Sequence, residues 1–203
     1  MKRMTKSSEY VRYLIGLVIM LVYIVVGVII LSIGEPNPYL TIVRFGALYG
    51  YISMFFATIL SNYIRDVRKI FNRPFLKIHH YFAAIGMVSI TIHPVVFSIY
   101  AASLLVFVPD FSSWYAFWSL AGRPALYLAY TAVLVSLLRT KLPKYWRYFH
   151  GSMYVVLTFA FVHGFLIGAN FTNPFIVVLF LIMLVLAYFT AISRFVRKRK
   201  GTN

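Results

Sequence analysis

The chain has 203 residues, of which 62% are hydrophobic, and its mean hydropathy is +0.83. Soluble domains are about half apolar, so this composition excludes an ordinary soluble protein and predicts a membrane protein. The sequence contains no cysteine, which excludes disulfides, iron–sulfur clusters and thiol catalysis. The formal net charge of +16 suggests nucleic acid at first sight, but the positions of the basic residues give a different explanation.

Six apolar segments are long enough to cross a bilayer, which requires about 20 residues per helix. In chain order the predicted spans are residues 13–33, 42–64, 78–106, 115–138, 148–169 and 175–195. The third segment is the longest, and we expect it to tilt or to end in the membrane interface. The sequence therefore predicts an all-α polytopic membrane protein, a six-helix bundle that forms a single domain over residues 1–203, with short basic ends at 1–12 and 195–203.

The Lys and Arg residues are distributed asymmetrically between the predicted loops. All but two of the 20 lie at the N-terminus, in residues 65–77, in residues 139–147 or in the C-terminal tail. The loops at 34–38, 108–113 and 169–174 contain no Lys or Arg. The positive-inside rule places the basic side, with both termini, in the cytoplasm. Topology and anionic lipid headgroups thus explain the charge of a plasma-membrane protein, and we expect no nucleic-acid partner.

The two basic residues that break this pattern are Arg44 and Arg123, at the outer ends of the second and fourth predicted spans. One interpretation is that both side chains extend into the interface. The other is that each binds an anion near the outer face, because arginines in membranes usually have a partner. The only acids on that side, Glu35 and Asp110, lie in loops. The sequence therefore predicts no acidic partner for these arginines within a neighbouring span.

All five histidines lie in the third and fifth predicted spans, which run in the same direction across the membrane. Near the cytoplasmic edge are His79, His80 and His150, and deeper toward the outer half are His93 and His163. Residues 14 or 13 positions apart are separated by about 20 Å along a helix. Four of the five histidines, His79 with His150 and His93 with His163, therefore form two layers, each with one member on each of two helices.

Helix periodicity tests which histidines share a face. Fourteen residues at 100° each fall about 40° short of whole turns, so His79 and His93 lie on one face. His80 lies about 140° from His93 by the same arithmetic, which favours His79 over His80 as the inner member. His150 and His163 are 13 residues apart, and a bend or a local change of winding would bring them onto one face. Gly151 and Gly164 follow these two histidines. They either let a cofactor ring approach the backbone closely or are simply glycines of the kind common in membrane spans.

Two facing histidines in each of two layers suit a flat macrocycle whose iron takes one axial ligand from each side. Bare zinc would need its ligands clustered at one depth. A proton relay would need acids within the spans, and the predicted spans contain none. The pattern favours non-covalently bound haem b, with two haems expected and one haem as the alternative.

The histidine stretches resemble those of the ferric reductase-like transmembrane superfamily, which includes NADPH oxidases, ferric reductases and the membrane haem subunit of the bacterial methionine sulfoxide reductase system. The motifs that carry the resemblance are IHH…ITIHP and YFHGSMYVVLTFAFVHG. The resemblance covers roughly residues 40–195. It implies an inner haem between His79 and His150 and an outer haem between His93 and His163.

The segments TIVRFGALYG and LAGRPALYLAY also resemble the starts of the second and fourth spans in this superfamily. The resemblance implies that Arg44 and Arg123 lie near haem propionates or near an outer quinone or substrate site. The methionine sulfoxide reductase-type subunits lack a counterpart of His79, which this chain has. A second haem is therefore expected here.

The chain has no Gly-rich dinucleotide motif, so we expect the electron donor to be a separate cytoplasmic flavoprotein or a membrane quinol. The expected function is one-electron transfer across the membrane to an outer acceptor: a ferric chelate, dioxygen, quinone or a partner reductase. The chain would then be a transmembrane oxidoreductase or its electron-transfer subunit. The alternatives are a quinone-linked cytochrome b subunit of a larger complex and a haem-free membrane transporter or scaffold.

Overall fold

The computed structural model describes residues 6–63 and 75–200, and all regular structure within them is helical. The predicted basic loop at 65–77 lies largely outside this part of the chain. The helices are α1 (Lys6–Ile33), α2 (Pro38–Leu60), α4 (Phe75–Tyr100), α5 (Trp114–Ser119), α6 (Gly122–Leu137), α7 (Trp146–Gly151), α8 (Met153–Ile167) and α9 (Pro174–Lys200), with two 3-10 helices, η1 (Leu104–Phe107) and η2 (Ala169–Thr172). This confirms the all-α class.

Five helical segments in the described part of the chain are long and apolar enough to cross a membrane. They are Tyr10–Ile33, Pro38–Leu60, Leu76–Tyr100, Trp146–Ile167 and Pro174–Val196. The predicted fourth span differs from the expectation, because it is divided into α5 and the 16-residue α6. Sixteen residues extend only about 24 Å, which is less than the ~30 Å of a hydrocarbon core. The count of six spans therefore stays a prediction.

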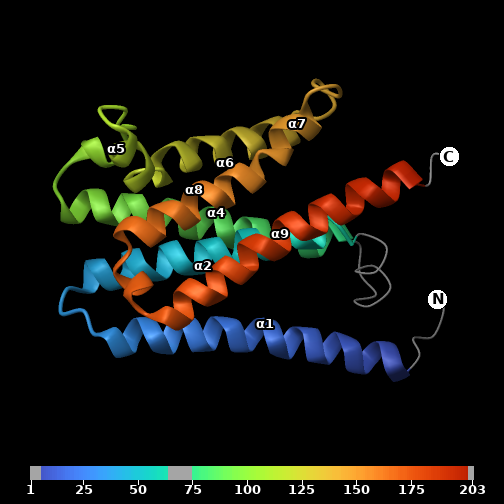
Figure 1. Ribbon diagram of the computed structural model, residues 1–203, viewed down its shortest axis with the longest axis horizontal. Helices are drawn as coiled ribbons and strands as arrows, with labels where there is room; N and C mark the ends of the chain where they lie inside the picture. The colour runs from blue at the N-terminus through green and yellow to red at the C-terminus, as the bar shows by residue number, and fades with distance from the viewer. Residues whose placement is uncertain (1–5, 64–74, 201–203) are drawn as a thin grey trace.

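The two ends of the bundle match the predicted distribution of loops (Figure 1). The first turns of α1 and the last turns of α9 lie at one end of the bundle, together with α7. The connections from α1 to α2, from α4 to α5 and from α8 to α9 lie at the other end. These are the three connections without Lys or Arg. The orientation of these ends relative to the cell stays a prediction.

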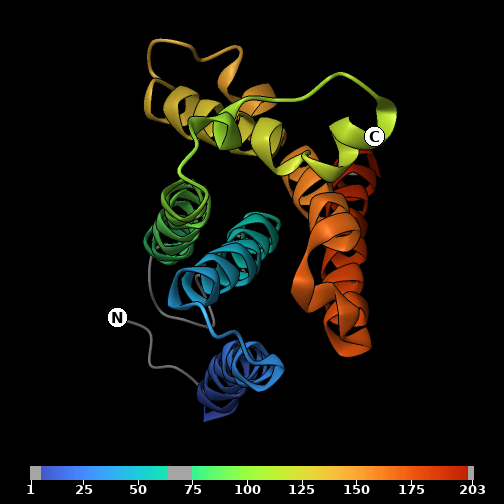
Figure 2. The same ribbon diagram turned by 90° about the vertical axis from the view of Figure 1, so that its left-hand side faces the viewer.

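The closest helix pair is α2 with α4, which lie side by side in Figure 2. A GxxxG spacing on α2 explains the contact. A Cβ at Gly46 would lie 2.9 Å from the carbonyl oxygen of Ser89, and a Cβ at Gly50 would lie 3.1 Å from the backbone nitrogen of Ile90. Small residues at this spacing let two membrane helices approach backbone to backbone. The position of α4 relative to α2 is thereby fixed.

The buried core lies where α1, α2, α6, α8 and α9 meet, and its largest fully buried side chains include Phe180, Ile30 and Ile52. Large apolar side chains also cover the outside of the bundle, as on α1, where Leu14 and Leu31 are 60% and 65% exposed. So much exposed apolar surface would be a liability in water and is expected against lipid. The structure thus supports a membrane-embedded protein.

Candidate functional site

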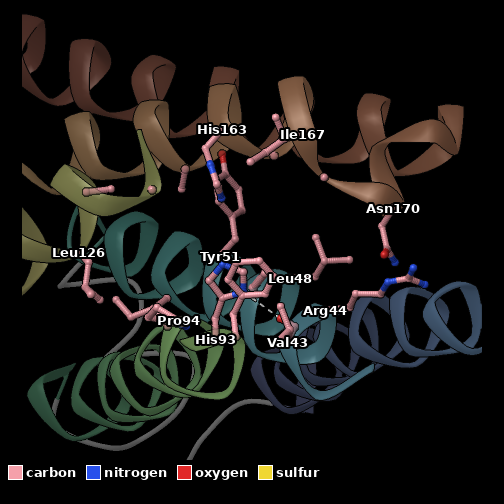
Figure 3. A pocket seen from close by; sticks show the side chains of 18 of the residues that line it. Val43, Arg44, Leu48, Tyr51, His93, Pro94, Leu126, His163, Ile167 and Asn170 are labelled. Atoms are coloured by element: carbon pink, nitrogen blue, oxygen red, sulfur yellow. Dashed lines mark hydrogen bonds between the residues drawn. The ribbon is translucent and has the colours of Figure 1, made fainter. Parts of the chain in front are cut away.

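The outer histidine pair joins α4 to α8. The rings of His93 and His163 have centroids 6.3 Å apart at an interplanar angle of 77°, and they point toward one another in Figure 3. Nδ1 of His93 lies 2.9 Å from the carbonyl oxygen of Val43 on α2. Nδ1 of His163 lies 2.6 Å from the carbonyl oxygen of Ser119 on α5. A carbonyl only accepts, so Nδ1 carries the proton in both rings and Nε2 keeps its lone pair.

The inner pair joins α4 to α7. The ring centroids of His79 and His150 are 5.9 Å apart at 71°, and Nδ1 of His79 lies 3.0 Å from the carbonyl oxygen of Ala57. Nδ1 of His150 is buried and makes no hydrogen bond of ordinary geometry, although the backbone of Ala132 lies where it can accept one. His80 is exposed, with its ring 5.8 Å from that of His79. The geometry therefore agrees with the preference for His79 over His80.

The backbone of α2 holds two of the three histidines of α4, His79 and His93. Val43 and Ala57 are 14 residues apart, the same separation as His79 and His93. Because the two helices run antiparallel, one contact register brings both carbonyls to the two rings. Neither carbonyl could be recognised from the sequence, since any residue supplies one. The GALYG stretch on α2 is the sequence signal that predicts the close contact.

The bend that the 13-residue spacing required is present. The fifth predicted span is broken at Ser152, where α7 ends and α8 begins. The change of winding there lets His150 and His163 both face α4. Of the two glycines considered from the sequence, Gly151 has open space around it and Gly164 packs on Phe171. Neither glycine contacts a histidine ring, and the approach of a cofactor ring to their backbone stays a prediction.

The glycine that touches a histidine ring is Gly122, at the start of α6. A Cβ there would lie 2.9 Å from Cδ2 and 3.1 Å from Nε2 of His163. A side chain at this position would therefore push the ring out of place. The three residues Gly122, Arg123 and Pro124 also mark where the fourth predicted span breaks. Proline is tolerated in the first turn because the N–H groups there have no partner within the helix.

The spacing of each histidine pair fits one metal ion between two imidazoles. Two metal–nitrogen bonds of about 2 Å, plus about 1 Å from each nitrogen to its ring centre, place facing rings roughly 6 Å apart. The observed centroid distances are 5.9 Å and 6.3 Å. Among the described residues no group of three or more His, Cys, Asp or Glu side chains could hold a metal ion. The donor set is thus two opposed imidazoles in each layer, which suits iron already held by a macrocycle.

A cavity of about 460 Å³ opens beside the outer pair and is lined by both His93 and His163. Its volume lies in the usual range for small-molecule and cofactor sites. Most of its lining is apolar, with side chains such as Leu48, Phe97 and Leu157. Figure 3 shows His93 and His163 in the middle of this lining. The cavity and the donor set together fit a flat, largely apolar cofactor.

Both arginines singled out from the sequence line this cavity. Nη2 of Arg44 lies 2.7 Å from Oε2 of Glu35, and each side chain is 15% exposed. The sequence predicts no acidic partner for Arg44 within a neighbouring span. Its partner, Glu35, lies in the loop between α1 and α2. Arg123 donates a hydrogen bond to the carbonyl of Val108. Arg123 also contributes, less than the hydrogen bonds from Ser112, to the lowered pKa of Asp110.

Two further polar side chains at the cavity are not evident from the sequence. Asn170 on η2 is 3% exposed, and neither its Oδ1 nor its Nδ2 has a hydrogen-bond partner. The hydroxyl of Tyr51 is likewise buried without a partner. Asn170 lies in the predicted loop at 169–174, and a loop position gives no indication that its side chain points inward. Buried polar atoms without partners are uncommon and indicate a missing bonding partner.

Comparison with known proteins gives no relative for this chain: no family model, no curated protein and no solved structure matches it.

Proposed function

We propose that this chain is a transmembrane electron-transfer protein that holds two b-type haems, the inner one by His79 and His150 and the outer one by His93 and His163. The observation that carries the proposal is the pair of opposed imidazole sets, with centroids 5.9 Å and 6.3 Å apart, each within a membrane-type helical bundle. The resemblance of the two histidine stretches to the ferric reductase-like superfamily adds to it.

The chain's own groups prepare the outer ligands. The bonds from Nδ1 to Val43 and Ser119 fix each ring's tautomer and direction, and they make the free nitrogen more basic. The apolar lining of the cavity excludes water around the ligands. Haem iron, when bound, supplies reversible one-electron chemistry. If both histidines of a pair held the iron, an acceptor would have to react at the edge of the site and not at the metal.

The direction of transfer that we propose is from the cytoplasm outward. Exposed basic residues gather on the connection between α6 and α7 and on the first turn of α7, which also carries His150. They are Arg139, Lys141, Lys144 and Arg147. This surface fits an acidic flavoprotein as donor, and a membrane quinol is the other donor class. The outer acceptor is a ferric chelate, dioxygen, a quinone or a partner reductase, which makes the chain an oxidoreductase or its electron-transfer subunit.

The test is the optical spectrum of the protein purified from haem-replete cells, with quantitation as the pyridine haemochrome. We expect two haems b per chain. A colourless preparation would overturn the proposal, and one haem per chain would restrict it to a single layer. His80→Ala is the matched control, because it removes an exposed neighbour of His79 and should leave both haems in place.

The haem-free scaffold makes a different prediction for the same residues. The bond from His93 to Val43 joins α4 to α2, and interhelical bonds of this kind stabilise membrane bundles without any cofactor. In His93→Asn the side-chain amide can still donate to a carbonyl but is a poor iron ligand. We expect the outer haem to be lost and the helices to remain assembled. A variant with the wild-type spectrum would support a purely structural histidine.

A further inference from the structure

The wall of the outer cavity is unevenly packed. α4 packs along α2 and α6 packs along α8, whereas α4 and α6 touch each other at only a few points. Both helices nevertheless line the cavity, α4 through Pro94 and α6 through Leu126. In Figure 3 these two side chains lie on the side of the lining away from Arg44 and Asn170. The seam between α4 and α6 is therefore a weakly packed part of the cavity wall.

The outer part of this seam is covered by the chain that follows α4. The hydroxyl of Tyr127 donates to the carbonyl oxygen of Phe107, the last residue of η1, at 2.9 Å. Arg123 donates to the carbonyl oxygen of the next residue, Val108. The side chain of Phe107 also lines the cavity. Two side chains of α6 thus hold the end of η1 across the seam.

The inner part of the seam is bridged by one hydrogen bond between side chains. The hydroxyl of Tyr130 lies 2.6 Å from Oγ1 of Thr91, two residues before His93 on α4. Oγ1 of Thr91 gives its only proton to the carbonyl oxygen of Met87 at 2.6 Å, so Tyr130 is the donor to Thr91. The bridge therefore crosses the seam beside the outer histidine pair.

The three residues of α6 form one row that faces lipid. Arg123, Tyr127 and Tyr130 follow the i, i+4, i+7 spacing of a single helix face. Tyr127 and Tyr130 are 49% and 43% exposed, and the exposed side chains on the nearby part of α4 include Ile92 and Val95. Single side-chain hydrogen bonds between membrane helices contribute little to stability. This row can therefore open without breaking any hydrogen bond within a helix.

We propose that the seam between α4 and α6, closed by Arg123, Tyr127 and Tyr130, is a lateral gate through which a flat apolar ligand passes from the bilayer to the outer histidine pair. An apolar lining suits a ligand that arrives from lipid and not from water. The identification of this ligand as haem rests on the proposed function, whereas the gate itself does not.

The first test measures access to the cavity from lipid and needs no haem. The chain has no cysteine, so Leu48→Cys places a single thiol in the lining, on α2 and away from the seam. The full-length protein, made in haem-limited cells and held in lipid vesicles, is labelled with N-(1-pyrenyl)maleimide. We expect Tyr130→Phe to speed this labelling several-fold, which is the scale of one lost hydrogen bond.

The chain offers a matched control for Tyr130. The hydroxyl of Tyr188 on α9 lies 2.9 Å from Oγ1 of Thr158 on α8, and neither residue lines the cavity. Tyr188→Phe therefore removes the same kind of bond from a different helix pair and should leave the labelling rate unchanged. Equal rates for Tyr130→Phe and for the parent Leu48→Cys protein would overturn the gate, as would equal acceleration by both tyrosine variants.

The second test closes the seam and identifies haem as the ligand. Cysteines that replace Thr91 and Tyr130 are joined by a short bis-maleimide before haemin is added. We expect the joined protein to take up haemin at a small fraction of the rate of the same variant without the linker. Cysteines that replace Thr158 and Tyr188 are the control, and their linkage should not slow uptake.

The two tests separate the gate from the proposed function. Unchanged haemin uptake after the seam is joined would overturn the gate as the route for haem. A protein that binds no haemin with or without the linker would overturn the proposed function. The pyrenyl labelling rates would then still decide whether the seam admits flat apolar molecules, because that reaction involves no haem.

Discussion

The two histidine pairs have nearly the same ring separation but different surroundings. In the outer pair, both rings are held by hydrogen bonds from Nδ1 to backbone carbonyls, and a cavity opens beside them. In the inner pair only His79 has such a bond of ordinary geometry, and His150 lies on a six-residue helix next to a break. Neither inner histidine lines the cavity. The two pairs therefore share a ring spacing and differ in how firmly the surrounding backbone orients each histidine.

The largest expected effect is on haem content, when one histidine of a single pair is replaced. His163→Ala should lower the haem content from two to one per chain and leave the inner layer, because the pairs share no residue. His150→Ala should remove the inner haem and leave the outer one. The measurement is pyridine haemochrome quantitation with low-temperature spectra of the reduced protein. Loss of both haems from either variant would contradict two independent layers.

The next effect acts on the outer ring without removing it. In Gly122→Ala the new methyl group would lie 2.9 Å from Cδ2 of His163, and the ring must turn away from its bond to Ser119. Loss of such orienting contacts typically costs 10- to 100-fold in affinity. We expect that weakening in the outer layer only, measured by haem retention during dilution. Gly16→Ala, where a Cβ meets open space, is the control, and equal retention in both variants would contradict the role of Gly122.

A smaller effect compares the wild-type layers directly. His150 lacks the orienting bond of ordinary geometry that the other three predicted haem-binding histidines, His79, His93 and His163, make. We therefore expect the inner haem to leave several-fold faster than the outer one when a haem-scavenging protein is added, because one such bond contributes about 1 kcal/mol. Stopped-flow spectra at the two absorption bands measure both rates. Faster loss from the outer layer would reverse the comparison.

The smallest expected effect is a change in the pKa of Asp110, in the connection between α4 and α5. Hydrogen bonds from the Ser112 hydroxyl and backbone lower the pKa of Asp110, with a lesser effect from Arg123. A lowered pKa in the folded state stabilises the fold above the unfolded pKa, and this contribution is lost as the pH falls through the folded pKa. Ser112→Ala should raise the pKa of Asp110 toward its ordinary value, as a carboxyl NMR titration would show. Both haem spectra should stay unchanged, and a change would connect this loop to the outer pair.

The sequence predicts the parts of this site that depend on periodicity. The positions of His79 and His93 on one face, and the need for a bend between His150 and His163, both followed from helix arithmetic, and the break at Ser152 agrees with it. Hydropathy could not reveal that the fourth predicted span is divided, because both pieces are apolar. The Gly122–Arg123–Pro124 sequence was the local signal for that break.

Contacts between distant segments were not predictable in the same way. Glu35 was set aside as a loop residue, yet the start of α2 folds it back onto Arg44. Asn170 reads as a turn residue, and only the placement of η2 against the cavity turns its amide inward. Each depends on where two elements meet in space, and neither has a periodic pattern. The periodicity of a single helix therefore cannot identify either residue as part of the site.

The GxxxG contact between α2 and α4 has a consequence for assembly. It fixes the carbonyls of Val43 and Ala57 against His93 and His79, so the two packed helices α2 and α4 form one wall of both layers. The opposite wall consists of α7 and α8, two pieces joined at Ser152. We expect α2 and α4 to pack against each other first during membrane insertion. The wall formed by α7 and α8, which is interrupted at Ser152, would then close on each cofactor. The order of assembly would therefore follow from which helices are continuous and which are broken.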